Sequence, residues 1–149
     1  PKILMDDENK VSPIDQFTPL YKNSKNIKIV QDAMFASTNE VRGTSYRSRI
    51  DDPKYQFAGK TGTAQVKKIT ERDRELDLKT FQIPYEERDH ALYIAYGPYK
   101  NPRYAVSILV EHGGNGSTTA APMAKKLFKT IIDRHQLRES INNKKYLDI

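Results

Sequence analysis

Ten residues, Phe57–Val66, constrain the fold of this chain more than any other stretch: Phe-Ala-Gly-Lys-Thr-Gly-Thr-Ala-Gln-Val. Small and β-branched residues around a single lysine predict a β-strand. Two glycines, Gly59 and Gly62, lie within this strand. Because a glycine inside a strand marks a close approach of a ligand or of another backbone, we expect something to pack tightly here.

The polar side chains of this strand favour binding of an anion. Strand alternation places the hydroxyls of Thr61 and Thr63 on one face and the side chain of Lys60 on the other. Two hydroxyls, a nearby ammonium and exposed backbone N–H groups together suit a carboxylate or a developing oxyanion.

A phosphate-binding P-loop is the alternative for Gly59-Lys60-Thr61, and the sequence excludes it. That motif requires a glycine at position 54, where this chain has Lys54. It also requires a helix directly after the threonine, whereas residues 64–66 continue the strand.

Composition bounds the remaining function classes. The chain has 149 residues, enough for one domain with its own core, and a net charge of +6. Charges of both signs are mixed, as in Glu71–Glu75, and no basic surface interleaved with aromatic residues is apparent. We therefore expect no nucleic-acid partner, but a solvated basic surface of a kind that also suits anionic lipid or cell-wall polymer.

No cofactor and no metal are expected. Cysteine is absent, which excludes thiolate ligands and disulfides. The three histidines, His90, His112 and His135, lack the mutual spacing of metal ligands, and we interpret His90 and His112 as structural or surface residues. Because the chain starts at Pro1 and has no long apolar run, we expect a processed or excised piece whose membrane anchor lies outside it.

The first half of the chain predicts one helix before the central strand. After an apolar start at Pro1–Met5, the stretch Asp6–Asn23 shows no clear period and is expected to be irregular. Helical spacing then predicts a helix over Asn26–Val41, capped by Ser24 or Asn26 and ended by Gly43. Its apolar residues are Ile27, Val30, Met34 and Val41.

The second half predicts a hairpin and a long helix. The central strand is expected over Tyr55–Lys68, followed by a charged and mobile excursion over Thr70–Asp89. Two further strands, His90–Tyr96 and Arg103–Val110, are expected to form an antiparallel hairpin whose tyrosines serve packing.

Ser117 is expected to cap the last helix. The apolar stripe of that helix consists of Met123, Leu127, Phe128, Ile131 and Ile132. Residues 140–149 are expected to form a frayed tail. These elements predict an α+β fold in which helices flank an antiparallel sheet.

Several short motifs occur in one order. Lys60-Thr61-Gly62-Thr63 is followed by His90-Ala91, Tyr96-Gly97-Pro98, Asn101-Pro102, Glu111, Gly113-Gly114 and Gly116-Ser117. In order and spacing they resemble a class B penicillin-binding protein, and within that class the peptidoglycan transpeptidases of cell elongation. The likeness runs from about Asn26 to Ile132 and implies that residues 1–149 are the C-terminal portion of a single transpeptidase domain with a penicillin-binding, β-lactamase-like fold.

The nucleophile of this family is absent from the chain. It lies in a Ser-x-x-Lys motif, and no serine here has a lysine three residues later. Ser37-Thr38-Asn39 matches the second family motif, Ser-x-Asn, but falls within the predicted helix, so we interpret the match as a coincidence. The isolated piece is therefore expected to be inactive.

The resemblance implies a serine-type D,D-transpeptidase that cross-links stem peptides ending in D-Ala-D-Ala and binds β-lactams. Lys60 and the backbone N–H of Thr63, as an oxyanion-hole donor, would take catalytic roles, and Thr61, Gly62 and Thr63 would bind the substrate. It further implies the periplasmic face of a bacterial inner membrane, with a membrane glycan polymerase and cell-shape proteins as partners. Two alternatives remain open, namely a β-lactamase-like or antibiotic-sensing relative and a non-catalytic cell-wall interaction module.

Overall fold

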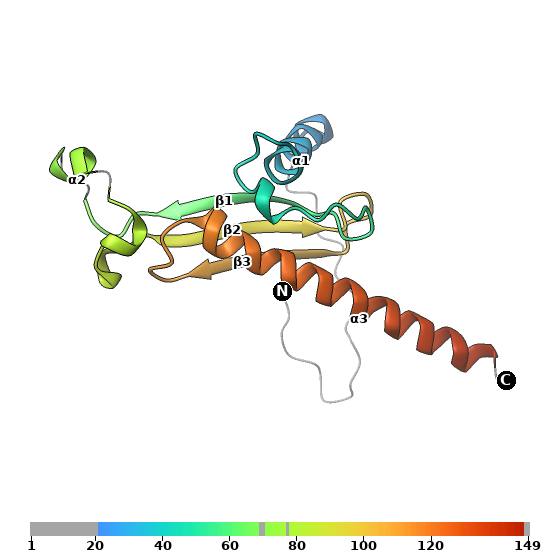
Figure 1. The fold of residues 1–149 in the computed structure, drawn as a ribbon. Helices are drawn as coiled ribbons and strands as arrows, with labels where there is room; N and C mark the ends of the chain where they lie inside the picture. Colours follow the sequence, from blue (N-terminus) through green and yellow to red (C-terminus); the bar gives the residue numbers. More distant parts are fainter. Residues whose placement is uncertain (1–20, 69–70, 77, 148–149) are drawn as a thin grey trace, which may run out of the picture.

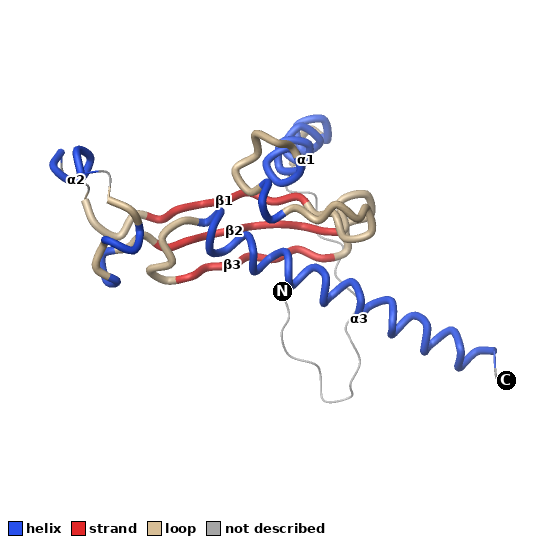
Figure 2. Tube along the Cα trace, viewed as in Figure 1, coloured by secondary structure: helices blue, strands red, loops and turns tan. Residues whose placement is uncertain are grey.

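A computed structural model describes residues 21–68, 71–76 and 78–147, in which helices pack around a small antiparallel sheet (Figures 1 and 2). The predictions for Pro1–Met5 and for most of Asp6–Asn23 lie outside the described residues. No helix in the described ranges is both long enough and apolar enough to cross a membrane.

The sheet has three strands in the order β1-β2-β3, and both strand pairs are antiparallel. Their bounds are β1 Ala58–Ala64, β2 His90–Gly97 and β3 Tyr104–Val110. The predicted hairpin and the α+β fold class are therefore confirmed.

Strand β1 is shorter than the predicted range of Tyr55–Lys68. At its end the chain turns, because the Gln65 side-chain amide donates to the carbonyl of Lys67 at 2.6 Å and the N–H of Val66 donates to Asp89 Oδ1 at 3.2 Å. These side-chain bonds take the place of a continued strand ladder.

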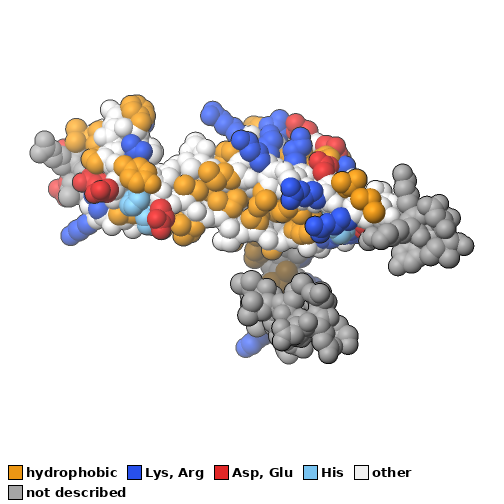
Figure 3. Space-filling model, turned by 90° about the horizontal axis from the view of Figure 1, so that it is seen from below, with side chains coloured by type: hydrophobic (Ala, Val, Ile, Leu, Met, Phe, Trp, Pro, Cys, Tyr) orange, Lys and Arg blue, Asp and Glu red, His pale blue; other side chains and the backbone are white. Residues whose placement is uncertain are grey.

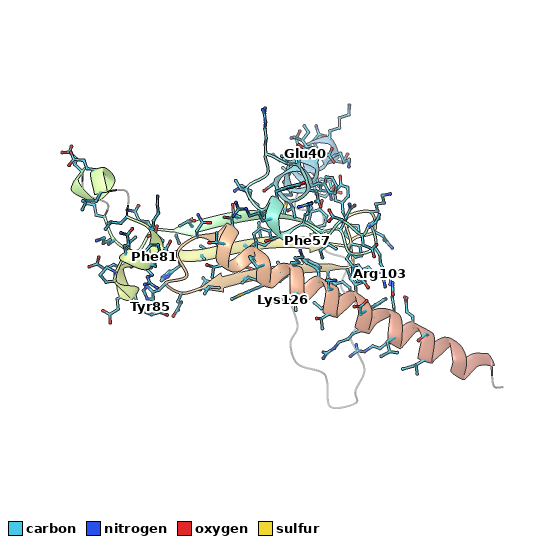
Figure 4. The ribbon with its side chains drawn as sticks, viewed as in Figure 1. Glu40, Phe57, Phe81, Tyr85, Arg103 and Lys126 are labelled. Carbon is cyan, nitrogen blue, oxygen red and sulfur yellow. The ribbon has the colours of Figure 1, made fainter. Side chains whose placement is uncertain are left out.

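One face of the sheet is covered by helix α3, Ala121–Leu147, which Figure 1 shows running obliquely across the strands. The ring of Phe57, labelled in Figure 4, stacks on Phe128 of this helix with ring centroids 5.0 Å apart. Tyr93 of β2 lies against Phe57 edge to face and is fully buried. This face therefore carries the hydrophobic core.

Helix α3 differs from its prediction in three respects. Its start is preceded by a π-helical turn, Gly116–Ala120, and the cap of that turn is Asn115 rather than Ser117. The buried row is Ala124, Phe128 and Ile132, whereas Met123 and Leu127 stay 46% and 39% exposed. The helix also extends well beyond the predicted stripe, as far as Leu147, since no glycine or proline follows Pro122; the fraying expected of residues 140–149 stays a prediction.

Helix α1, Ser24–Asn39, starts two residues before its predicted beginning. Asn23 caps it by accepting from the N–H of Lys25 at 2.9 Å, so the predicted caps Ser24 and Asn26 are wrong. Its predicted apolar stripe is largely exposed, and Val30, for example, is 55% exposed. The buried residue of this helix is Thr38, so α1 meets β1 through a polar contact.

The excursion between β1 and β2 contains α2, Glu71–Leu76, and two 3₁₀ turns, Thr80–Gln82 and Tyr85–Glu87. Phe81 is 79% exposed and lies with Tyr85 at one end of the molecule, as Figure 4 shows. The mobility expected of this segment stays a prediction.

The other face of the sheet exposes large apolar side chains. Ile94 and Leu109 are 52% and 57% exposed. Seen from below, hydrophobic side chains spread across the middle of the molecule, and Lys and Arg side chains gather to one side (Figure 3).

Candidate functional site

The candidate site lies at the outer edge of β1, the edge that faces away from β2. Gly59 directs its polar backbone groups to this edge: its N–H donates to Thr38 Oγ1 at 3.0 Å, and its carbonyl accepts from the same hydroxyl at 3.4 Å. The register with β2 is regular from residue 58 to residue 64. Because backbone groups alternate along a strand, the N–H and C=O groups of Thr61 and Thr63 point to the same edge.

This edge is covered over only part of its length. Helix α1 occupies it at residues 57–59, where Asn39 Nδ2 donates to the carbonyl of Phe57 at 3.0 Å. Beyond that point, no strand in the described ranges pairs with β1 on this side. The backbone of Thr61 and Thr63 can therefore pair with an added extended chain.

Lys60 and the two threonines lie on opposite faces, as predicted. Lys60 is level with the exposed Ile94, whereas Thr61 is level with the buried Tyr93. The lysine side chain nevertheless returns to the edge, since Nζ donates to the carbonyl of Thr61 at 2.8 Å and approaches Thr61 Oγ1 at 3.4 Å. The ammonium and both hydroxyls thus come from one short segment of strand.

A row of hydroxyls extends from this segment and was not predicted from the sequence. Thr61 Oγ1 lies 3.3 Å from Thr44 Oγ1, which lies 3.1 Å from Ser37 Oγ. Thr44 belongs to the turn after α1, and Ser37 to the last part of that helix. The pair Gly43-Thr44 is adjacent in sequence to the predicted end of the helix, but nothing in its composition indicates contact with Thr61.

The two glycines of the strand serve different contacts. A Cβ atom on Gly59 would lie 2.4 Å from the hydroxyl oxygen of Tyr93, so this glycine makes room for a buried ring. A Cβ atom on Gly62 would meet Leu92 Cβ at 3.3 Å and otherwise only ordinary contacts. The predicted close approach is thus to the Tyr93 ring at Gly59. At Gly62 it is to the backbone of Gly116, where a Cβ atom would lie 2.6 Å from the carbonyl oxygen of Gly62.

An open groove of about 520 Å³ runs along α1 and includes Lys60 in its lining. Its walls are apolar where the helix contributes Ile29, Val30 and Met34, and polar near Ser37, Thr44 and Lys60. The groove therefore combines an apolar wall with the polar residues of the candidate site.

Ser37-Thr38-Asn39 lies on α1, as predicted, and the contacts of Thr38 and Asn39 are structural. Thr38 is fully buried and bonds to Gly59 and, at 2.9 Å, to the Tyr93 hydroxyl. Burial raises the pKa of Tyr93, and its bonds to Ser45 and Thr38 oppose that rise. The ring therefore stays neutral and anchors helix to sheet.

The histidines also make structural contacts. The N–H of His112 donates to His90 Nδ1 at 3.0 Å, which links the end of β3 to the start of β2. His135 lies at the opposite end of the sheet, where it contacts Tyr104, Arg103 and Glu139. Among the described residues, no group of three or more His, Cys, Asp or Glu side chains is placed to hold a metal ion.

Comparison with known proteins assigns the chain to a family. The sequence matches the penicillin binding protein transpeptidase domain over residues 15–132. The chain belongs to this family, which confirms the predicted resemblance.

Two curated relatives are the peptidoglycan D,D-transpeptidases MrdA of Salmonella typhimurium and Haemophilus influenzae. The first is 36% identical over 105 residues, covering 70% of this chain, and the second 39% identical over 101 residues, covering 68%. The chain spans only 16% and 15% of their respective lengths.

Two solved structures share the fold. One is a complex between PBP2 and MreC from Helicobacter pylori, with a TM-score of 0.56 and 33% identity, covering 73% of this chain and 17% of that one. The other is Pseudomonas aeruginosa PBP2 in complex with WCK 5153, with a TM-score of 0.60 and 29% identity, covering 82% of this chain and 24% of that one.

Proposed function

We propose that this chain is the C-terminal part of the transpeptidase domain of a peptidoglycan D,D-transpeptidase that also binds β-lactams. The observation that carries the proposal is the outer edge of β1, where Lys60 supplies an ammonium, and Thr61 and Thr63 supply two hydroxyls and backbone groups that no described strand pairs on this side. The family and the MrdA relatives support this assignment.

In the proposed complex, a stem peptide ending in D-Ala-D-Ala lies along this edge as an added strand. Gly62 has no side chain, so the peptide backbone can lie close to β1. The N–H of Thr63 points outward and would donate to the oxyanion that forms at the reacting carbonyl. Loss of one such donor raises a barrier by about 2.7–4 kcal/mol.

The side chains of the same segment would hold the terminal carboxylate of the peptide. The ammonium of Lys60 supplies positive potential, and the hydroxyls of Thr61 and Thr63 donate hydrogen bonds. Each charge-assisted bond contributes about 1.5–3 kcal/mol. Lys60 would also face the proton-relay serine of the second family motif, which we place outside these 149 residues.

The nucleophilic serine would likewise come from another part of the protein. Its hydroxyl oxygen attacks the penultimate carbonyl and forms an acyl-enzyme, and the peptide bond breaks with release of D-alanine after proton transfer to the leaving nitrogen. An amine of a neighbouring peptidoglycan strand then attacks the acyl-enzyme and displaces the serine. A β-lactam opens its ring in the first step and remains attached.

The complex of H. pylori PBP2 with MreC supports a cell-shape protein as a partner. By the same family relationship, a membrane glycan polymerase is a second partner. We place the whole protein at the periplasmic face of a bacterial inner membrane, with an anchor outside these residues.

Labelling with a fluorescent penicillin tests the proposal. The full-length protein should form a stable covalent adduct, and the 149-residue chain alone should form none because it lacks the serine. Rapid loss of the label would indicate a β-lactamase-like enzyme, and an unlabelled full-length protein would favour an interaction module. A stable adduct on the isolated chain would contradict the absence of the nucleophile and point first to Ser37.

A further inference from the structure

We propose that Thr44 is a positioning residue of the candidate site, which directs the hydroxyl proton of Thr61 toward the carboxylate of the substrate. The inference rests on the proposed function and adds to it a residue outside the site strand. Its starting point is the row of hydroxyls from Ser37 through Thr44 to Thr61, with spacings of 3.1 and 3.3 Å.

The turn that carries Thr44 is fixed by its neighbours. Gly43 packs against the last part of α1 so closely that a Cβ atom there would lie 2.3 Å from the carbonyl oxygen of Ser37. Ser45 is 1% exposed, and its N–H and its hydroxyl both donate to the carbonyl of Ser37 at 3.0 Å. Thr44 is held between two anchored residues, so the position of its side chain does not depend on its own hydrogen bonds.

A hydroxyl has one proton to donate and two lone pairs that accept. Lys60 Nζ donates into Thr61 Oγ1 at 3.4 Å and occupies one lone pair. If Thr44 donates into the other, the proton of Thr61 is left for a ligand.

Bonds at Thr44 itself permit this direction. Ser37 Oγ lies 3.1 Å from Thr44 Oγ1, and when Ser37 donates into Thr44 the proton of Thr44 is free to turn toward Thr61. With an anion at Thr61, Ser37 donates to Thr44, Thr44 donates to Thr61, and Thr61 donates to the anion. This arrangement is favoured because every hydroxyl then donates toward the negative charge. Without Thr44, the hydroxyl of Thr61 can rotate away from the ligand.

A purely structural role accounts less well for these contacts. Thr44 is exposed, and backbone bonds on both sides of it already tie the turn to α1. A bond between two exposed hydroxyls contributes little to folding, since water replaces either partner. The groove along α1 is lined by Lys60 and also by Ser37 and Thr44, so the row is accessible to a ligand.

Acylation kinetics of the full-length protein test this role through Thr44→Val, which keeps the shape but removes the hydroxyl. With a carboxylate-bearing penicillin, we expect the apparent dissociation constant to rise about two- to tenfold, the range of one hydrogen bond, with little change in the limiting acylation rate. Thr44→Ser should restore wild-type binding. Thr130→Val, a matched control on the outer side of α3, should leave both constants unchanged.

A double-mutant cycle with Thr61→Val decides whether Thr44 acts through Thr61. In that background, Thr44→Val should have almost no further effect on binding. Three results would each overturn the inference: additive losses of affinity in the double variant, the same loss of affinity in Thr44→Ser as in Thr44→Val, or unchanged affinity in Thr44→Val. An unacylated wild-type protein would instead overturn the proposed function, and this inference with it.

Discussion

The hydroxyl of Thr38 contacts both polar backbone groups of Gly59: it accepts from the N–H at 3.0 Å, and its one proton is shared between the carbonyls of Gly59 at 3.4 Å and Met34 at 3.3 Å. A side chain of α1 thus completes the ladder of β1 where a neighbouring strand would otherwise stand. The same hydroxyl contacts Tyr93 across the sheet. This contact fixes how far along β1 the helix covers the edge, and therefore where the candidate site begins.

Replacing Thr38 with valine should destabilise the domain by about 1–3 kcal/mol, because it leaves buried polar groups of Gly59 and Tyr93 without this partner. Thr38→Ser keeps the hydroxyl and should lose much less. Thermal unfolding of the full-length protein checks the difference. Equal unfolding midpoints for the valine variant and the wild type would show that the contact contributes nothing to stability.

The two glycines of the strand should respond differently to alanine. Gly59→Ala places a methyl group 2.4 Å from the buried Tyr93 hydroxyl and should cost about 1–3 kcal/mol or more of stability. Gly62→Ala meets Leu92 at 3.3 Å, so the domain should fold while β-lactam acylation slows. Measuring unfolding and acylation for both variants separates these effects. Similar stability losses at the two positions would contradict the distinction.

An acid-sensitive contact should tie α3 to the segment before β1. Hydrogen bonding from Tyr55 lowers the pKa of Asp133 below its ordinary value of 3.8. Since the folded-state pKa is depressed, the stabilisation is present above the ordinary pKa and is lost as pH falls through the folded value.

The unfolding midpoint of the wild type should therefore exceed that of Asp133→Asn at about pH 6, and the gap should close as the pH falls below the ordinary pKa of 3.8. Asp133 is exposed and Tyr55 is only half-buried, so the difference will be small. A gap that persists unchanged at low pH would show that the charge of Asp133 is not its source.

The sheet and the hairpin were predictable because strand alternation and turn residues are local signals. The contacts that the helices make with the sheet were less predictable. The apolar stripe of α1 indicated an apolar packing face. The helix instead meets β1 through the buried Thr38, a contact that depends on the tertiary structure. In α3, Ala124 and Phe128 are fully buried, whereas Met123 and Leu127 of the predicted stripe stay partly exposed, because the sheet meets only one side of the helix.

The site strand itself was predictable down to the opposite faces of Lys60 and Thr61. Two features were not. The return of Lys60 Nζ to the edge depends on its rotamer, and the contact of Thr44 with Thr61 joins residues 17 positions apart. No periodicity in a single sequence carries such a pairing.

The most direct test of the account is the rate of β-lactam acylation of full-length Lys60→Ala. An exposed ammonium at a strand edge contributes little to folding but much to carboxylate binding, so the rate should fall by orders of magnitude while the unfolding midpoint is kept. Thr63→Ala should lower the acylation rate less, because the outward N–H remains. Thr61→Val should weaken β-lactam binding by about the value of one charge-assisted hydrogen bond. Wild-type acylation in all three variants would contradict the assignment of this strand to the transpeptidase site.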